Sequence, residues 1–139
     1  MQVNIPGHLF AQLPFYDVAE SDDAVVVDLH HRSDLVNTRG AMQGGLIATL
    51  IDVAAGRLAF KFCDPRAGAG TADMSIHFLA PVTEGPARAT ATLVRAGKRL
   101  IVVDVDVHDV GRGRLAARAT LSFAVMEARV AKESASGAA

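Results

Sequence analysis

The chain has 139 residues, the size of a single domain, and half of them are hydrophobic, with 12 glycines besides, which excludes a disordered or linker role. Its 14 Lys and Arg residues nearly balance 15 Asp and Glu residues, so no net positive field would hold nucleic acid or an anionic membrane. The apolar surplus favours an oligomer, because a second copy can cover apolar surface that one short domain leaves exposed.

Disulfide, metal and membrane classes are also disfavoured. The lone cysteine, Cys63, cannot form an intrachain disulfide, and the histidines lack the spacing of a metal site. No apolar run approaches the roughly 18 residues of a membrane span, and the first ten residues do not resemble a signal peptide. We therefore expect a cytoplasmic protein that uses no metal or other cofactor and binds neither nucleic acid nor membrane.

The first strand signal is the apolar run from Val25 to Leu29. Turn residues at 21–23 predict that this strand forms a hairpin with a short strand near 16–19.

One long helix is predicted over about 44–62, where apolar residues recur at steps of three and four. Its opposite side combines small residues with one carboxylate: Gly45, Thr49, Asp52 and Gly56. A solvated helix usually carries Lys, Glu or Gln on such a side. The small residues therefore indicate close approach by a ligand or another backbone.

Four further strands are predicted by alternating residues at about 74–78, 85–97, 101–108 and 114–126. Short turns with Gly or Pro separate them, which is typical of antiparallel neighbours. We predict an α+β fold in which an antiparallel sheet of about five or six strands wraps around one long central helix. We place this domain at residues 1–130 and expect a disordered, small and polar tail at 131–139.

The segment 36–45, VNTRGAMQGG, leads into the predicted helix and combines glycines with the free N–H groups of a helix start. Asp52 follows Gly44 after about two helical turns. Acyl transfer to water needs a donor for the carbonyl oxygen and a group that activates the nucleophile. Gly44 and Asp52 are therefore candidate catalytic groups.

The arrangement N-x2-G-x2-Q-G-G-x6-D, formed by Asn37, Gly44, Gly45 and Asp52, resembles the acyl-coenzyme A thioesterases of the hotdog superfamily, especially the phenylacetate-degradation type. The resemblance continues through the run from Thr71 to Pro81 and, more loosely, to Met126, so that it covers about residues 10–126. It implies a hotdog fold, and it implies an enzyme that hydrolyses an aromatic or medium-chain acyl-CoA to the free acid and CoA.

The resemblance also implies roles for individual residues. Asp52 would be the general base or nucleophile, and the Gly44 N–H would polarise the thioester carbonyl. Asn37 matches an asparagine near the water and carboxylate, and Thr71 matches a hydroxyl that orients the water. In the family these groups come from two subunits, so the resemblance implies a homotetramer built as a dimer of dimers.

Gln43 departs from the family pattern, which commonly has histidine before the paired glycines. A glutamine amide can donate a hydrogen bond but does not titrate near neutral pH. A non-catalytic module that binds or senses acyl-CoA therefore remains an alternative, and a purely structural partner domain ranks last.

Two further groups are candidates for substrate binding. Arg95, Lys98 and Arg99 flank a predicted hairpin turn and could hold CoA phosphates, although exposed basic residues usually serve only solubility. Gly45 joins them as a substrate-binding candidate at the helix start. Phe10, Phe15 and Phe60 are candidates for an acyl pocket.

Overall fold

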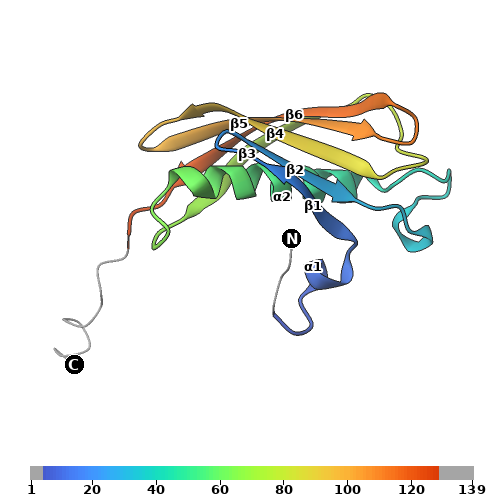
Figure 1. Cartoon of the computed structure of the whole chain (residues 1–139), viewed down its shortest axis with the longest axis horizontal. Coiled ribbons are helices and arrows are strands. Elements are labelled where there is room, and N and C mark those ends of the chain that lie inside the picture. Colours follow the sequence, from blue (N-terminus) through green and yellow to red (C-terminus); the bar gives the residue numbers. More distant parts are fainter. Residues whose placement is uncertain (1–4, 129–139) are drawn as a thin grey trace.

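The computed structural model describes residues 5–128, in which a six-stranded antiparallel sheet curves over one long helix (Figure 1). The strands are β1 (Phe15–Glu20), β2 (Ala24–Leu29), β3 (Ala69–Phe78), β4 (Ala87–Ala96), β5 (Leu100–Asp109) and β6 (Arg114–Val125). Their order across the sheet is β1-β2-β4-β5-β6-β3. The helices are α1 (Leu9–Gln12) and α2 (Gly44–Ala59), with 3₁₀ turns at Ser33–Leu35 and Phe60–Phe62. The predicted fold class is confirmed.

The core lies between α2 and the concave face of the sheet (Figure 1). Along β5 the apolar residues Ile101, Val103, Val105 and Val107 are fully buried, while the residues between them face outward. In β4 the inward positions are Ala87, Ala89 and Ala91, whose small side chains let α2 lie close to the middle of the sheet.

The predicted helix corresponds to α2 and the 3₁₀ turn after it. Its predicted apolar stripe is buried at Ile47, Leu50, Ile51, Ala54, Ala55 and Leu58, and only half-buried at Leu46 and Phe62. The predicted early hairpin is the pair β1–β2, with Phe15 opposite Leu29. Sequence patterns did not predict α1, which has only four residues. The expected tail at 131–139 lies outside the described residues.

The sheet has two edges, β1 and β3, and they differ in character. β1 is short and carries Asp17 and Glu20, which pair with Arg57 of α2. β3 has ten residues, most of them exposed, including the large apolar Met74 and Phe78. None of the helices in residues 5–128 has the length and apolar character that a membrane crossing needs.

A buried carboxylate at the end of β5 holds the loop that leads into β4. Asp109 is fully buried, and it accepts hydrogen bonds from the backbone N–H groups of Thr83 (2.9 Å), Glu84 (3.2 Å) and Gly85 (2.8 Å). Burial alone would raise the pKa of this carboxyl, but the N–H donors outweigh it and hold the pKa below its usual value. The carboxylate thus replaces the water that these loop amides would otherwise bind.

We predict that Asp109→Asn lowers the free energy of unfolding by about 1–3 kcal/mol, because the amide NH₂ faces backbone donors. Since folding lowers the pKa of Asp109, its contribution is complete above the unfolded-state value of about 3.9 and disappears as the pH falls through the lower folded-state value. Urea unfolding at neutral and acidic pH checks both statements. The exposed control Asp106→Asn, which weakens a surface pair with Arg118, should cost less; equal losses in the two variants would contradict the prediction.

Candidate active site

Asp52 lies on the side of α2 that the sheet leaves uncovered. Its Oδ1 accepts a hydrogen bond of 2.7 Å from the hydroxyl of Thr71 on β3. Both residues line a cavity of about 490 Å³, whose walls include the aromatic residues Phe10, Phe60 and Phe123. This contact brings the predicted residues Asp52 and Thr71 together, with the second carboxylate oxygen facing no hydrogen-bond partner among residues 5–128.

A bulge in β3 makes this contact possible. Thr71 lies opposite Phe123 and Asp73 lies opposite Ser122, so Ala72 is an extra residue in the ladder. Thr71 and Phe78 are seven positions apart, and in a regular strand they would project to opposite faces. Because of the bulge, Thr71 contacts Asp52 near the middle of α2, while Phe78 lies beside Gly44 at its start.

The start of α2 lines a second cavity, of about 280 Å³, with Asn37, Gly44 and Phe78 in its walls. The first N–H groups of a helix have no partner within the helix. The N-cap residue Gln43 is exposed and makes no side-chain cap. The Gly44 end of α2 can therefore offer N–H donors to a carbonyl oxygen, and Gln43 can add its amide.

Asn37 holds the loop before α2 rather than the carboxylate. Its Oδ1 accepts hydrogen bonds from the backbone N–H groups of Arg39 (2.9 Å) and Ala41 (3.2 Å). Its amide nitrogen has no hydrogen bond to any other described residue, so it can donate to a ligand in the Gly44 cavity. Within one chain, the structure brings Asn37 to Gly44 and not to Asp52.

Glycine is not required by the chain itself at three positions of α2. A Cβ on Gly44 would meet Phe78 at 3.7 Å, one on Gly45 would meet nothing within 4 Å, and one on Gly56 would meet Phe123 at 3.8 Å. None of the three has positive φ. A glycine inside a helix costs roughly 0.5–1 kcal/mol relative to alanine. The open space beside these glycines therefore suits something outside the chain.

The two cavities are separate in one chain. Gly44 and Asp52 are eight residues apart on one helix, so about 12 Å of helix axis lies between them. Reacting atoms must approach to about 3–3.5 Å. One chain thus holds both kinds of candidate catalytic group, but not at a distance at which they could act on the same carbonyl.

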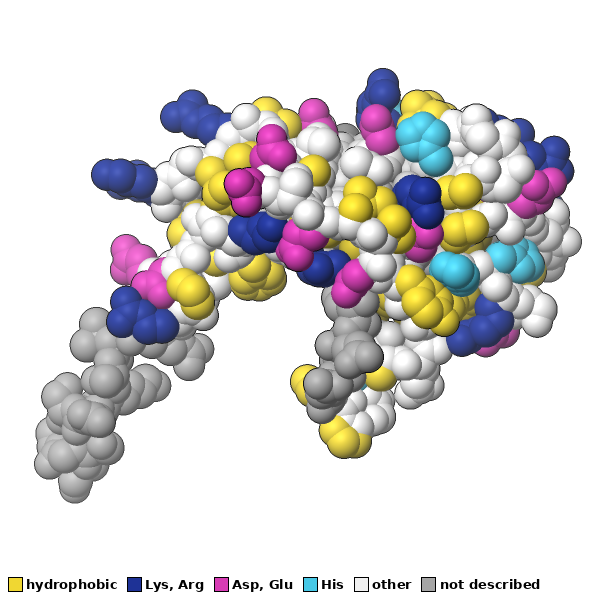
Figure 2. Space-filling view, in the orientation of Figure 1, with side chains coloured by type: hydrophobic (Ala, Val, Ile, Leu, Met, Phe, Trp, Pro, Cys, Tyr) yellow, Lys and Arg dark blue, Asp and Glu magenta, His cyan; other side chains and the backbone are white. Residues whose placement is uncertain are grey.

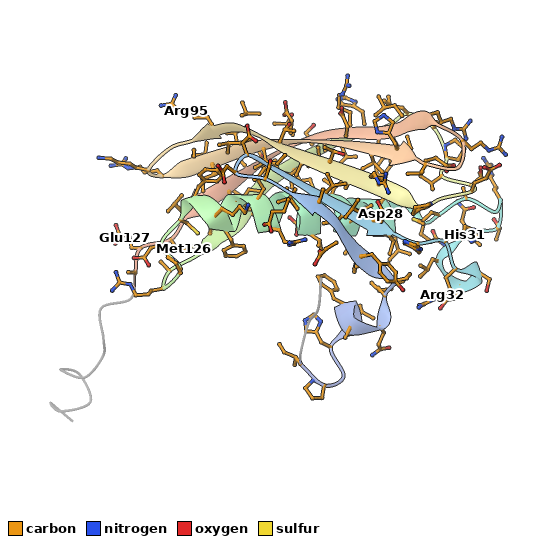
Figure 3. The ribbon with its side chains drawn as sticks, viewed as in Figure 1. Asp28, His31, Arg32, Arg95, Met126 and Glu127 are labelled. Atoms are coloured by element: carbon orange, nitrogen blue, oxygen red, sulfur yellow. The ribbon has the colours of Figure 1, made fainter. Side chains whose placement is uncertain are left out.

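The predicted basic residues Arg95, Lys98 and Arg99 are exposed and surround a third hollow of about 600 Å³ at the β4–β5 hairpin. Figure 2 shows basic side chains projecting at the upper left, and Figure 3 shows Arg95 pointing away from α2. The Arg99 carbonyl accepts a hydrogen bond from Val125, which lies opposite Ala69. The hairpin is therefore at the end of the sheet where β3 begins, and the structure does not bring its side chains into the Asp52 cavity or the Gly44 cavity.

The structure brings together two of the three phenylalanines that were predicted to line one pocket. Phe10 and Phe60 line the Asp52 cavity, but Phe15 does not, because it is only 6% exposed and packs in the core. His8, which sequence reasoning did not select, also lines this cavity. No sequence signal marks it, since it caps a helix of four residues that has no periodicity to detect.

Known proteins share this fold and part of this sequence. The profile of the thioesterase superfamily matches residues 39–116, more than half of the chain and including Gly44, Asp52 and Thr71. This chain belongs to the thioesterase superfamily. A thioesterase of Haemophilus influenzae superposes with a TM-score of 0.82 at 17% identity, covering 91% of this chain and 87% of that one, which confirms the hotdog fold.

Two relatives are more similar in sequence. A candidate esterase of Saccharolobus solfataricus is 34% identical over 66% of the present chain, and the match spans only 59% of that relative's own length. A Bacillus halodurans protein, whose crystal structure is with CoA, is 32% identical with a TM-score of 0.66, covering 71% of this chain and 65% of that one.

Gly56 allows a test of whether the fold itself requires glycine on the open side of α2. We predict that Gly56→Ala raises the free energy of unfolding by about 0.5–1 kcal/mol, because alanine favours the helix and its Cβ meets Phe123 at an ordinary distance. Urea unfolding measures the change, and Ala54→Gly, at a buried position on the same helix, should act in the opposite direction. A loss of stability in Gly56→Ala would show that the folded protein itself needs this glycine.

Proposed function

We propose that this protein is an acyl-CoA thioesterase that hydrolyses an aromatic or medium-chain acyl-CoA to the free acid and CoA. The observation that carries the proposal is the Asp52–Thr71 pair, which lines a cavity whose walls include three phenylalanines. The helix that carries Asp52 also offers free N–H donors at its start, where a second cavity lies. Membership of the thioesterase superfamily supports this reaction class. The phenylacetate-degradation type rests on the spacing of Asn37, Gly44, Gly45 and Asp52.

A complete site forms, in this proposal, between two chains paired through β3. One end of β3 reaches the Asp52 cavity through Thr71, and the other end reaches the Gly44 cavity through Phe78. A second copy that adds its own β3 antiparallel to this edge sets the two ends opposite each other. Asp52 of one chain then faces Gly44 of the other, twice in each dimer.

The reaction then follows from the two halves. The N–H of Gly44 stabilises the negative charge that develops on the thioester oxygen, with Gln43 and Asn37 as further amide donors. As a general base, Asp52 takes a proton from water, whose oxygen bonds to the carbonyl carbon. As a nucleophile, Asp52 instead forms a mixed anhydride that water hydrolyses. On either route the C–S bond breaks, and CoA leaves as a thiolate that takes up a proton.

Thr71 fits either route because its hydroxyl donates to Oδ1 and fixes the orientation of the carboxylate. The remaining oxygen of Asp52 is then the atom that faces water or the carbonyl carbon. Arg95, Lys98 and Arg99 are proposed to bind CoA phosphates, together with the backbone at Gly45. We also propose a cytoplasmic homotetramer, a dimer of these dimers, that uses no cofactor.

We predict that Asp52→Asn lowers kcat for acyl-CoA hydrolysis by at least about 10²-fold, the scale of general base catalysis, because asparagine keeps the shape but cannot take a proton. Thiol release from phenylacetyl-, benzoyl- and straight-chain acyl-CoA esters measures the change. The matched control is Asp104→Asn, since Asp104 accepts a 2.7 Å bond from Thr120 on the outer face of the sheet. Equal activity in the two variants would contradict the role of Asp52; binding without turnover in the wild type would favour the binding module.

A shared site predicts rescue between two inactive variants. Asp52→Ala and Gly44→Val should each be inactive, since one removes the carboxylate and the other displaces the N–H donor. Mixed and reassembled in equal amounts, they should recover up to about a quarter of wild-type activity, because half of the dimers are mixed and each mixed dimer holds one intact site. Light scattering should show a dimer or larger species. No recovery in verified mixed dimers would place both groups in one chain's site.

A further inference from the structure

The wall of the Asp52 cavity contains a histidine in addition to its aromatic rings. His8 is half-buried and lines this cavity with Phe10, Phe60 and Phe123. The only other basic residue in the wall is Arg57, whose guanidinium is paired with Asp17 and lies 3.9 Å from Glu20. Arg57 is therefore neutralised by β1, whereas His8 has no acidic partner among residues 5–128.

The contacts of His8 define which nitrogen carries the hydrogen. Nδ1 accepts a 3.1 Å hydrogen bond from the backbone N–H of Phe10, where it caps α1. A nitrogen that accepts a hydrogen bond is unprotonated, so the neutral imidazole carries its hydrogen on Nε2. The ring also packs edge-on against the Phe10 ring, with centroids 5.2 Å apart. Two contacts thus hold the ring, and Nε2–H makes no hydrogen bond to any described residue.

A hydrogen-bond donor in a mostly apolar wall discriminates between acyl groups. An acyl group with an oxygen acceptor can accept a hydrogen bond from Nε2–H. An apolar group of the same size displaces water from this donor and leaves it without a hydrogen bond. Sites that bond a substrate oxygen reject the analogue that lacks it far more strongly than an apolar pocket separates methylenes. The aromatic walls meanwhile hold the carbon skeleton of either group.

We propose that His8 is a specificity-determining residue that selects acyl groups bearing a hydroxyl or other oxygen beyond the thioester carbonyl. The inference rests on the proposed thioesterase function and deepens it, because it names the chemistry of the acyl group. It assigns His8 no part in the bond-breaking steps, which belong to Asp52 and Gly44.

The test compares CoA esters that differ only by a hydroxyl in place of a methyl group. The pairs are para-hydroxyphenylacetyl with para-methylphenylacetyl, the corresponding meta pair, and omega-hydroxyoctanoyl with nonanoyl. We expect wild type to favour the hydroxyl member of at least one pair by about tenfold or more in kcat/KM. Calorimetric binding of the same pairs to Asp52→Ala measures the same preference without turnover.

Two substitutions separate the donor from the cap. His8→Ser keeps an oxygen that can cap α1 but removes the Nε2–H at the far side of the ring, and His8→Phe keeps a ring without either nitrogen. Both should lower kcat/KM for the hydroxyl member more than for the methyl member and so abolish the hydroxyl preference. Leu9→Ala, an exposed change in α1 outside the cavity, should keep the preference.

Three outcomes would overturn the inference: no preference in wild type by either measurement, an unchanged preference in both His8 variants, or an equal loss for both members of a pair. Failure of the proposed function is a separate result, in which wild type releases no thiol from any ester. The binding measurement still tests His8 in that case.

Discussion

The burial of one stripe of α2 beneath the curved sheet is the constraint on which the remaining features depend. Leu50, Ile51, Ala54 and Leu58 are fully buried, so the helix cannot rotate about its axis without exposing them. The same constraint turns Asp52 and Gly56 toward the open side. A separate contact joins the start of α2 to the loop that Asp109 holds: the backbone N–H of Met42 donates a 2.8 Å hydrogen bond to the carbonyl of Val82.

Much of this architecture follows from residue patterns that act locally. Steps of three and four predicted α2, and the alternation of valines predicted β5, because each pattern is set by which face of one element is buried. The glycines and the carboxylate on the far side of α2 could be recognised for the same reason. The sequence resemblance added Asn37, Thr71 and the expectation that the chemistry is shared between subunits.

Other features depend on contacts that no local pattern encodes. The bulge at Ala72 is a property of the β3–β6 register, and without it Thr71 would face away from Asp52. His8 and Phe10 reach the cavity from the segment that precedes β1, and the four-residue helix there has too few positions to show a period. Phe15 was assigned to the pocket from its side chain alone, but its strand turns it into the core.

The exposed edge of β3 also affects the tendency of the protein to aggregate. Ten residues of strand with exposed Met74 and Phe78 present unpaired backbone groups that any extended chain can join. β1, by contrast, has only six residues, and its charged residues Asp17 and Glu20 form ion pairs with Arg57 and Lys61. A newly made or diluted chain therefore has an aggregation-prone edge on one side of the sheet only, and the dimerisation that we propose would compete with aggregation for the same ten residues.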